Sequence, residues 1–334
     1  MDHVIDILKN WTLPISITMG TLVFLMFHCI NVLAPLKAPV ESFVGFFIPT
    51  LVFVMLFITF CKINPRHMQI KKWHLILVLF QILSCVLIAA VLFFYPSFPY
   101  RIGAEGAMVC LIAPTATAAA VITGKLGGNE ASLTSYTIIS NMAAAVLIPV
   151  IFPLIEGRGD ATFIQQLMVI SRQVFPLLIF PFFLAWGIRL FLPKLLEIIL
   201  KHCGSLAFYL WGIALMVVVG QTLRSLANSD ASHATIWTLA IIGLLTCCIQ
   251  FAAGKIIGGC YNDRISGGQG LGQKNTVFAI WISYTYLLPV TSIAPSSYIL
   301  WQNIINSWQL WHYNKNQSKK INHIKWKNSH INIP

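Results

Sequence analysis

Runs of 16 to 40 residues without a charged side chain follow one another along most of this chain. A helix needs about 20 apolar residues to cross a bilayer core of roughly 30 Å. Only 10% of the residues are charged and 57% are hydrophobic, whereas a soluble domain has about 25% charged residues. The runs are also too long for the strands of a membrane β-barrel, which alternate over about ten residues. The pattern therefore predicts an all-α membrane protein and excludes a soluble enzyme or a secreted domain.

Charged residues and proline, glycine or asparagine breaks divide the chain into ten expected transmembrane spans. They are residues 12–35, 42–61, 74–95, 104–124, 131–155, 173–190, 204–224, 232–256, 266–288 and 291–312. We expect residues 161–172 to form an interfacial lead-in to the sixth span. Residues 313–334 are expected to form a flexible basic tail. The whole chain, 1–334, would be one integral membrane domain whose first apolar run is a span and not a cleaved signal peptide.

Lysine and arginine are distributed unevenly between the loops that this division creates. With the N-terminus placed inside, 16 of them fall in the inside loops and the tail, and four fall in the outside loops. Such a bias over short loops marks the cytoplasmic side. Both termini are therefore expected to be cytoplasmic, in a protein that spans the cell (inner) membrane many times and has the lipid bilayer as its partner. The net charge of +12 then reflects topology and not nucleic-acid binding.

Two halves of the chain match at an offset of 162 residues. Pro14 and Pro176 are expected to open the first and sixth spans, and the segments 135–141 and 297–303 both have the form Ser-Tyr-x-x-x-x-Asn. The repeats would cover residues 12–155 and 161–312. Because each contains five spans, an odd number, the second copy would be inserted upside down. Inverted repeats are characteristic of secondary transporters.

The fourth and ninth expected spans are both interrupted. Pro114 removes a backbone donor in the middle of the fourth span. The ninth begins with four glycines within residues 267–272, just before a polar run. A broken helix survives in a membrane only where it lines a cavity or is buried in protein. We expect the two breaks to cross at a binding site, and the alternative is a simple proline kink beside a glycine packing seam.

Lys274 is the one charged residue that falls well inside an expected span. A lysine near the middle of a membrane costs about 3 kcal/mol on insertion scales. It could extend toward the cytoplasmic surface, but its neighbours Gln273, Asn275 and Thr276 form a polar cluster that lipid would not accept. Of the ten carboxylates only Glu105 comes close to membrane depth. This balance favours an anionic ligand over a cation.

Other polar residues within the spans either line a cavity or form hydrogen bonds between helices. The repeat places Asn141 and Asn303 at corresponding positions, which favours them as site residues. The remaining residues of this kind include Gln81, Thr137, Ser140, Gln250 and Gln302. We expect no catalytic residue, metal site or cofactor, because no nucleophile and base pair or group of metal ligands lies at depth.

At the two interrupted spans the chain resembles the bile acid:sodium symporter family. The segment Ala113-Pro114-Thr115-Ala116-Thr117-Ala118-Ala119-Ala120 corresponds to that family's fourth-span motif, roughly Cys-Pro-Gly-Gly-Thr-Ala-Ser-Asn. The segment Gly270-Leu271-Gly272-Gln273-Lys274-Asn275-Thr276 corresponds to its ninth-span motif, roughly Glu-x-Gly-x-Gln-Asn-Ser/Thr. The resemblance covers residues 12–312. It implies ten spans in two inverted repeats, with crossed broken helices and transport of an organic anion.

The departures from the family pattern fall on the residues that hold sodium in that family. Its Ser-Asn ligands correspond to Ala119 and Ala120, its Glu to Gly270 and its Gln to Lys274, while Thr137 keeps a fifth-span ligand position. One hydroxyl cannot hold sodium alone. The resemblance therefore implies organic-anion transport, but not sodium coupling through these positions.

The sequence therefore predicts a secondary active or facilitative transporter of a small organic anion. Lys274 would supply positive charge, and Pro114, Thr115, Thr117, Gln273, Asn275 and Thr276 would complete the site. A lysine at this depth could also carry a coupled proton. The alternatives are a sodium symporter with a relocated ion site and, less favoured, a membrane-embedded enzyme.

Overall fold

The computed structural model describes residues 2–63, 68, 70–155, 162–203 and 206–331. Regular structure in these residues is helical, apart from one isolated β-bridge. Six helical segments are long and apolar enough to cross a membrane: Asn31–Lys62, Lys72–Phe94, Glu130–Ile155, Phe163–Phe191, Tyr209–Ala227 and His233–Gly259. The expectation of an all-α chain with membrane-type helices is thus confirmed.

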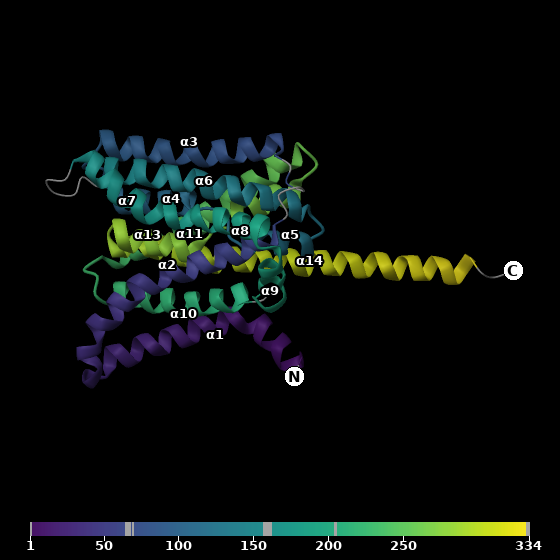
Figure 1. Cartoon of the computed structure of the whole chain (residues 1–334), viewed down its shortest axis with the longest axis horizontal. Coiled ribbons are helices and arrows are strands. Elements are labelled where there is room, and N and C mark those ends of the chain that lie inside the picture. The colour runs from purple at the N-terminus through teal and green to yellow at the C-terminus, as the bar shows by residue number, and fades with distance from the viewer. Residues whose placement is uncertain (1, 64–67, 69, 156–161, 204–205, 332–334) are drawn as a thin grey trace.

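The helices follow one another with short connections (Figure 1). The first half contains α1 (Asp2–Cys29), η1 (Asn31–Leu36), α2 (Lys37–Lys62), α3 (Lys72–Phe94), α4 (Arg101–Ile112), α5 (Ala119–Lys125) and α6 (Glu130–Ile155). The second half contains α7 (Phe163–Leu178), α8 (Phe180–Phe191), α9 (Pro193–Cys203), α10 (Leu206–Ala227), α11 (His233–Gly259), α12 (Arg264–Gly272), α13 (Thr276–Tyr286), η3 (Pro289–Ser292) and α14 (Ile293–Ile331).

The other four expected spans also fall on helices, but these helices differ in kind. The first corresponds to the apolar part of α1, Pro14–Cys29, which is shorter than the six segments above. The fourth and ninth each consist of two short helices, α4 with α5 and α12 with α13. The tenth is the first part of α14. The interruptions expected in the fourth and ninth spans are therefore present.

Helix α7 begins at Phe163, within the segment 161–172 that is expected to lead into the sixth span. Thr162 caps this helix: its hydroxyl accepts from Gln165 N at 3.4 Å, and the Gln165 side chain accepts from Thr162 N at 2.9 Å. This reciprocal pair is a capping box, a strong start signal for a helix. The polar residues Thr162 and Gln165 therefore begin a helix.

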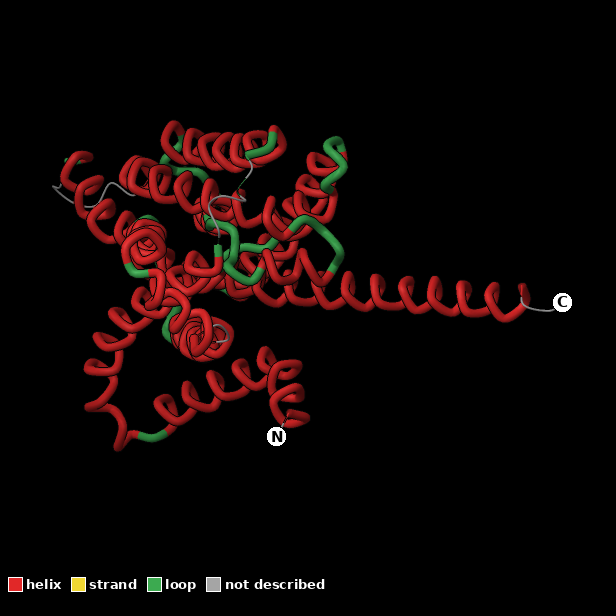
Figure 2. The backbone as a smooth tube through the Cα atoms, turned by 45° about the vertical axis from the view of Figure 1, so that its right-hand side comes forward, coloured by secondary structure: helices red, strands yellow, loops and turns green. Residues whose placement is uncertain are grey.

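The two prolines differ in position. Pro14 lies inside α1 but opens its apolar part, Pro14–Cys29, which corresponds to the first expected span, whereas Pro176 lies inside α7 and does not open the sixth. The tail is not a flexible segment, because α14 continues as one helix to Ile331 and projects beyond the bundle (Figures 1 and 2). Residues 313–331 contain neither proline nor glycine, so nothing there ends the helix that the apolar residues begin.

The helices pack as two groups. In the α2 group, α1 packs on α10, and α2 packs on α7, α8, α9 and α10. In the α11 group, α11 packs on α4, α12 and α14, while α3 and α12 pack on α6. The groups are joined by the packing of α6 on α7, and also by contacts of α13 with α2 and of η3 with α10. The N-terminus and the projecting end of α14 lie at the same end of the bundle, the terminal end, as Figure 1 shows.

A glycine seam holds the short helix α12 against α11. A Cβ at Gly254 would overlap the Gly267 carbonyl oxygen, and a Cβ at Gly267 would overlap the Gly254 carbonyl oxygen. A Cβ at Gly267 would also come within 2.7 Å of the Gly258 Cα. Small residues let helix backbones approach closely in membranes. The glycine packing seam, which the sequence offered as an alternative to a broken helix, is therefore present together with the break. The seam positions α12 against α11.

We expect Gly267→Ala to destabilise the protein by about 1–3 kcal/mol, because the methyl group meets backbone that cannot rotate away. The matched control is Gly187→Ala in α8, where an added Cβ meets nothing within 4 Å. Alanine should leave stability unchanged there or raise it slightly. Thermal unfolding in detergent would measure both. Equal melting temperatures for the two variants would contradict the close seam.

Candidate functional site

The two broken helices meet at a crossing, which comprises residues 113–118 between α4 and α5 and residues 273–275 between α12 and α13. The two segments run antiparallel, and Thr115 and Lys274 form a β-bridge. Ala116 N donates to Gln273 O, and Asn275 N donates to Pro114 O, each at 2.8 Å. Each break therefore satisfies backbone groups that the other leaves without helical partners.

Local sequence explains where both helices stop. Ala113 precedes a proline and has φ −53° and ψ 135°, the extended conformation that a following proline favours. Gln273 ends α12 in a similar extended conformation, after the glycine-rich run. Asn275 then caps α13, because its side-chain oxygen accepts from Phe278 N at 3.2 Å. Asparagine is a preferred residue at a helix start.

Three consecutive carbonyl groups at the end of α4 each accept a hydrogen bond from a different side chain. The donors are Gln250 Nε2 to Cys110 O at 3.2 Å, Lys274 Nζ to Leu111 O at 3.1 Å and Gln81 Nε2 to Ile112 O at 2.9 Å. They come from α11, the second break and α3. The last carbonyls of a helix have no partner within the helix, so these side chains replace the missing turn.

A second set of bonds completes the end of α12 and the two bridge residues. Thr115 Oγ1 donates to Gly270 O at 2.7 Å, Tyr298 OH donates to Gly272 O at 2.6 Å, Thr115 N donates to Ser140 Oγ at 3.1 Å and Lys274 N donates to Gln302 Oε1 at 3.0 Å. Helices α6 and α14 therefore support the crossing from two sides.

The Lys274 side chain is only 1% exposed. Its ammonium group lies against the Leu111 carbonyl inside the bundle, whereas snorkelling would carry it along the surface. The carboxyl end of a helix has a partial negative charge, which a nearby cation stabilises. The lysine thus places its amino group at the end of α4, where the two breaks meet.

The structure brings some predicted site residues together and separates others. Pro114, Thr115, Gln273, Lys274 and Asn275 form the crossing itself. Thr276 follows as the buried first residue of α13, and Thr117 lies half-buried in the turn before α5.

The remaining candidates, Thr137, Asn141 and Asn303, bond within their own helices. Thr137 Oγ1 donates to Leu133 O at 3.1 Å, and Asn141 Nδ2 donates to Thr137 O at 2.8 Å. Asn303 Nδ2 donates to Ile299 O at 2.6 Å. Asn141 and Asn303, which lie 162 positions apart, thus make the same kind of bond, one turn back along the helix.

Sequence analysis missed the role of Tyr298 and left Gln81, Ser140, Gln250 and Gln302 undecided between cavity lining and hydrogen bonding. All five bond to the crossing or to the helix ends beside it. Tyr298 corresponds to Tyr136 in the repeat, but both had been treated only as markers of that repeat. A buried tyrosine normally finds a hydrogen-bond partner, and this was the available signal.

The position of Gly270 leaves no space for a side chain. A Cβ there would lie 2.8 Å from Tyr136 Cδ1 and 3.1 Å from Leu133 Cδ1. Ala119 at the start of α5 is fully buried and has only a methyl group to offer. Apolar atoms therefore occupy places where the resemblance would require oxygen ligands.

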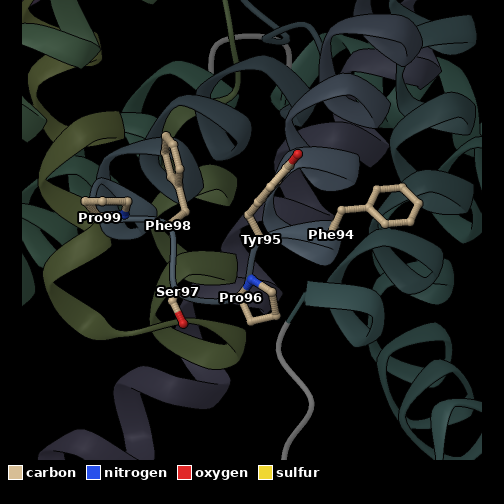
Figure 3. A pocket seen from close by; sticks show the side chains of 6 residues that line it. All are labelled: Phe94, Tyr95, Pro96, Ser97, Phe98 and Pro99. Atoms are coloured by element: carbon tan, nitrogen blue, oxygen red, sulfur yellow. The ribbon is translucent and has the colours of Figure 1, made fainter.

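A hollow of about 330 Å³ lies away from the crossing, at the connection between α3 and α4 (Figure 3). Its lining comes from the single stretch Phe94–Pro99 and consists of aromatic rings, prolines and one serine. None of these six lining residues has a charged side chain. The crossing, with its buried charge and convergent polar groups, is the better candidate for a functional site.

We expect Tyr298→Phe to destabilise the protein by about 1–3 kcal/mol, because the buried Gly272 carbonyl loses its hydrogen bond while the ring still fills its space. Tyr95→Phe is the matched control, since Tyr95 is 68% exposed. The difference in thermal unfolding between the two variants measures the effect. Identical stability would mean that the tyrosine hydroxyl does not support the crossing.

Comparison of the chain with protein-family models and with curated proteins finds no match. The residues of the crossing, their partners and their charge are therefore the basis for a functional proposal.

Proposed function

We propose that this protein is a secondary active or facilitative transporter of a small organic anion, built like the bile acid:sodium symporters from ten spans in two inverted repeats. The observation that carries the proposal is a buried lysine at the crossing of two broken helices. Broken helices near the middle of the membrane form the substrate and ion sites of many transporters. A buried charge in a membrane protein marks a functional site by default.

One pair of hydrogen bonds beside the crossing supports the inverted repeat. Ser140 accepts from the backbone N–H of Thr115, and Gln302 accepts from that of Lys274. The two accepting residues are 162 positions apart, which is the offset of the repeat in the sequence.

Ten spans follow if the four remaining helical segments also cross the bilayer. The α4–α5 pair covers residues 101–125, and the α12–α13 pair covers residues 264–286, each long enough for a span of about 20 residues. Both termini lie at one end of the bundle, as an even number requires. With the uneven distribution of lysine and arginine, this supports a cell-membrane protein with both termini in the cytoplasm.

Electrostatics favours an anion as the substrate. The Lys274 ammonium donates a hydrogen bond to the Leu111 carbonyl oxygen. Among the described residues, no ion pair involves this lysine. At a distance of about 7 Å and an effective dielectric constant of about 20, such a charge would attract an anion by roughly 2 kcal/mol. Thr117, Asn275 and Thr276 are the polar residues beside it that would hydrogen-bond the substrate.

Sodium coupling through the family's usual positions does not fit these residues. Ala119, Ala120, Gly270 and Lys274 offer no side-chain oxygen, and a protonated Lys274 would supply a cation there instead. One observation favours the alternative of a relocated sodium site. Buried amide oxygens of Asn141, Gln250, Gln269 and Gln273 have no hydrogen-bond partner among the described residues. Carbonyl-type oxygens of this kind are ligands for hard cations.

We expect Lys274→Met to reduce transport at least tenfold, because it removes the cation from the crossing. The measurement is counterflow of cholate, estrone sulfate and pyruvate in proteoliposomes from pH 6 to 9. If the lysine acts as a fixed charge, wild-type transport should be insensitive to pH over this range, and Lys274→Arg should keep more activity than Lys274→Met. A strong dependence on pH, with Lys274→Arg inactive, would indicate a proton carrier instead.

The matched control is Lys194→Met, which removes an exposed lysine from α9. It should transport like the wild type. Full activity of Lys274→Met would contradict both roles and leave the lysine without a function in transport.

A further inference from the structure

Polar contacts join the two helix groups near the end of the bundle opposite the termini. Tyr286 OH donates to Gln173 Oε1 of α7 at 2.6 Å. Thr222 Oγ1 of α10 lies 2.8 Å from Ser296 Oγ of α14. Tyr284 OH donates to the backbone carbonyl of Gln221 in α10. We call these three contacts the latch.

The direction of α14 shows at which end of the bundle the latch lies. Its C-terminal part projects from the terminal end (Figure 1), so its first residues, including Ser296, lie toward the opposite end. Tyr284 and Tyr286 form the last turn of α13, directly before η3 and α14. Tyr286 is 7% exposed and packs edge to face against the rings of Phe152 and Trp281. The two groups are therefore closed against each other at this end.

The same interface contains buried polar atoms that are not satisfied. Gln221 Oε1, on the α10 turn that receives Tyr284, has no hydrogen-bond partner among the described residues. Thr291 Oγ1 in η3, which packs on α10, likewise has no hydrogen-bond partner among the described residues. A buried polar group without a partner destabilises the closed interface, whereas each hydrogen bond of the latch stabilises it. Separation of the groups would let water satisfy these oxygens, which offsets part of the loss of the latch bonds.

We propose that the latch is a reversible gate that closes the access route to the crossing from the end opposite the termini. This inference rests on the proposed transport function and identifies the contacts that would break in each cycle. In the structure the three contacts are made, so the gate is shut at this end. Opening would exchange the three latch bonds for hydration of the same groups and of Gln221 and Thr291.

Disulfide cross-linking tests whether gate opening is required. In a variant without the eight native cysteines, Thr222→Cys with Ser296→Cys should form a disulfide on mild oxidation, since the two hydroxyl oxygens are 2.8 Å apart. A protease site in the α10–α11 connection lets the chain be cut between the two cysteines. After cleavage the two halves stay together only if the disulfide has formed. Thr222→Cys with Leu300→Cys is the control, because Leu300 is one turn further along α14 and 42% exposed.

We expect the first pair to cross-link, to lose counterflow of the three anions at least tenfold and to recover on reduction. The control pair should not cross-link and should keep its counterflow activity. Failure of the first pair to cross-link, or a cross-link with unchanged counterflow, would overturn the gate and leave the transport proposal intact. Absence of counterflow before oxidation would instead count against the transport proposal.

A labelling experiment tests whether the gate opens, without the use of a substrate. Ser225→Cys places a thiol at a position that is 8% exposed in α10, one turn from the latch. An impermeant maleimide added from the side opposite the termini should label it slowly, and severalfold faster in combination with Ser296→Ala. The matched control is Ser297→Ala, which removes a bond to Ala240 O inside the α11 group. Equal labelling rates for the two serine variants would overturn the proposal.

Discussion

The antiparallel pairing of the two helix breaks is the interaction on which this structure depends. A bilayer offers no water to unpaired backbone groups, so an interrupted helix is tolerated only where protein satisfies it. Here the segment around Thr115 and the segment around Lys274 satisfy each other. Side chains from α3, α6, α11 and α14 bond the remaining carbonyl and N–H groups. Neither break could exist alone, which explains why the chain interrupts both helices.

Much of this arrangement could be predicted from the sequence because its signals are local. Proline before a small-residue run and glycines before a polar run mark the two breaks, and Lys274 is conspicuous within its apolar surroundings. The supporting bonds could not be predicted, since a buried glutamine such as Gln81 bonds whichever carbonyl the fold brings near it. Polar residues place the start of the sixth span at residue 173 in the sequence, whereas the capping box of Thr162 and Gln165 begins α7 at Phe163. Charge in the tail predicts flexibility, but residues 313–331 contain no proline or glycine that would end α14.

The charge of Lys274 connects the crossing to the proposed function. In its protonated form the Lys274 side chain would stabilise the carboxyl end of α4 and give the interior of the bundle net positive charge. A neutral or cationic substrate would gain nothing from that field, whereas an organic anion would be attracted. The proposed gate adds the second element that a transporter needs, because a site at the crossing must be closed from one end while it is reached from the other. Both elements follow from contacts between helices and not from a single residue.

The central claim is that a built-in cation, and not bound sodium, makes the crossing selective for an anion. The most direct measurement is the thermal stability of the purified protein with organic acids and with their neutral methyl esters, each in sodium and in choline buffer. We expect at least one acid to raise the melting temperature while its ester does not, with equal shifts in both buffers. Esters that stabilise as well as the acids, or stabilisation that appears only with sodium, would contradict the account.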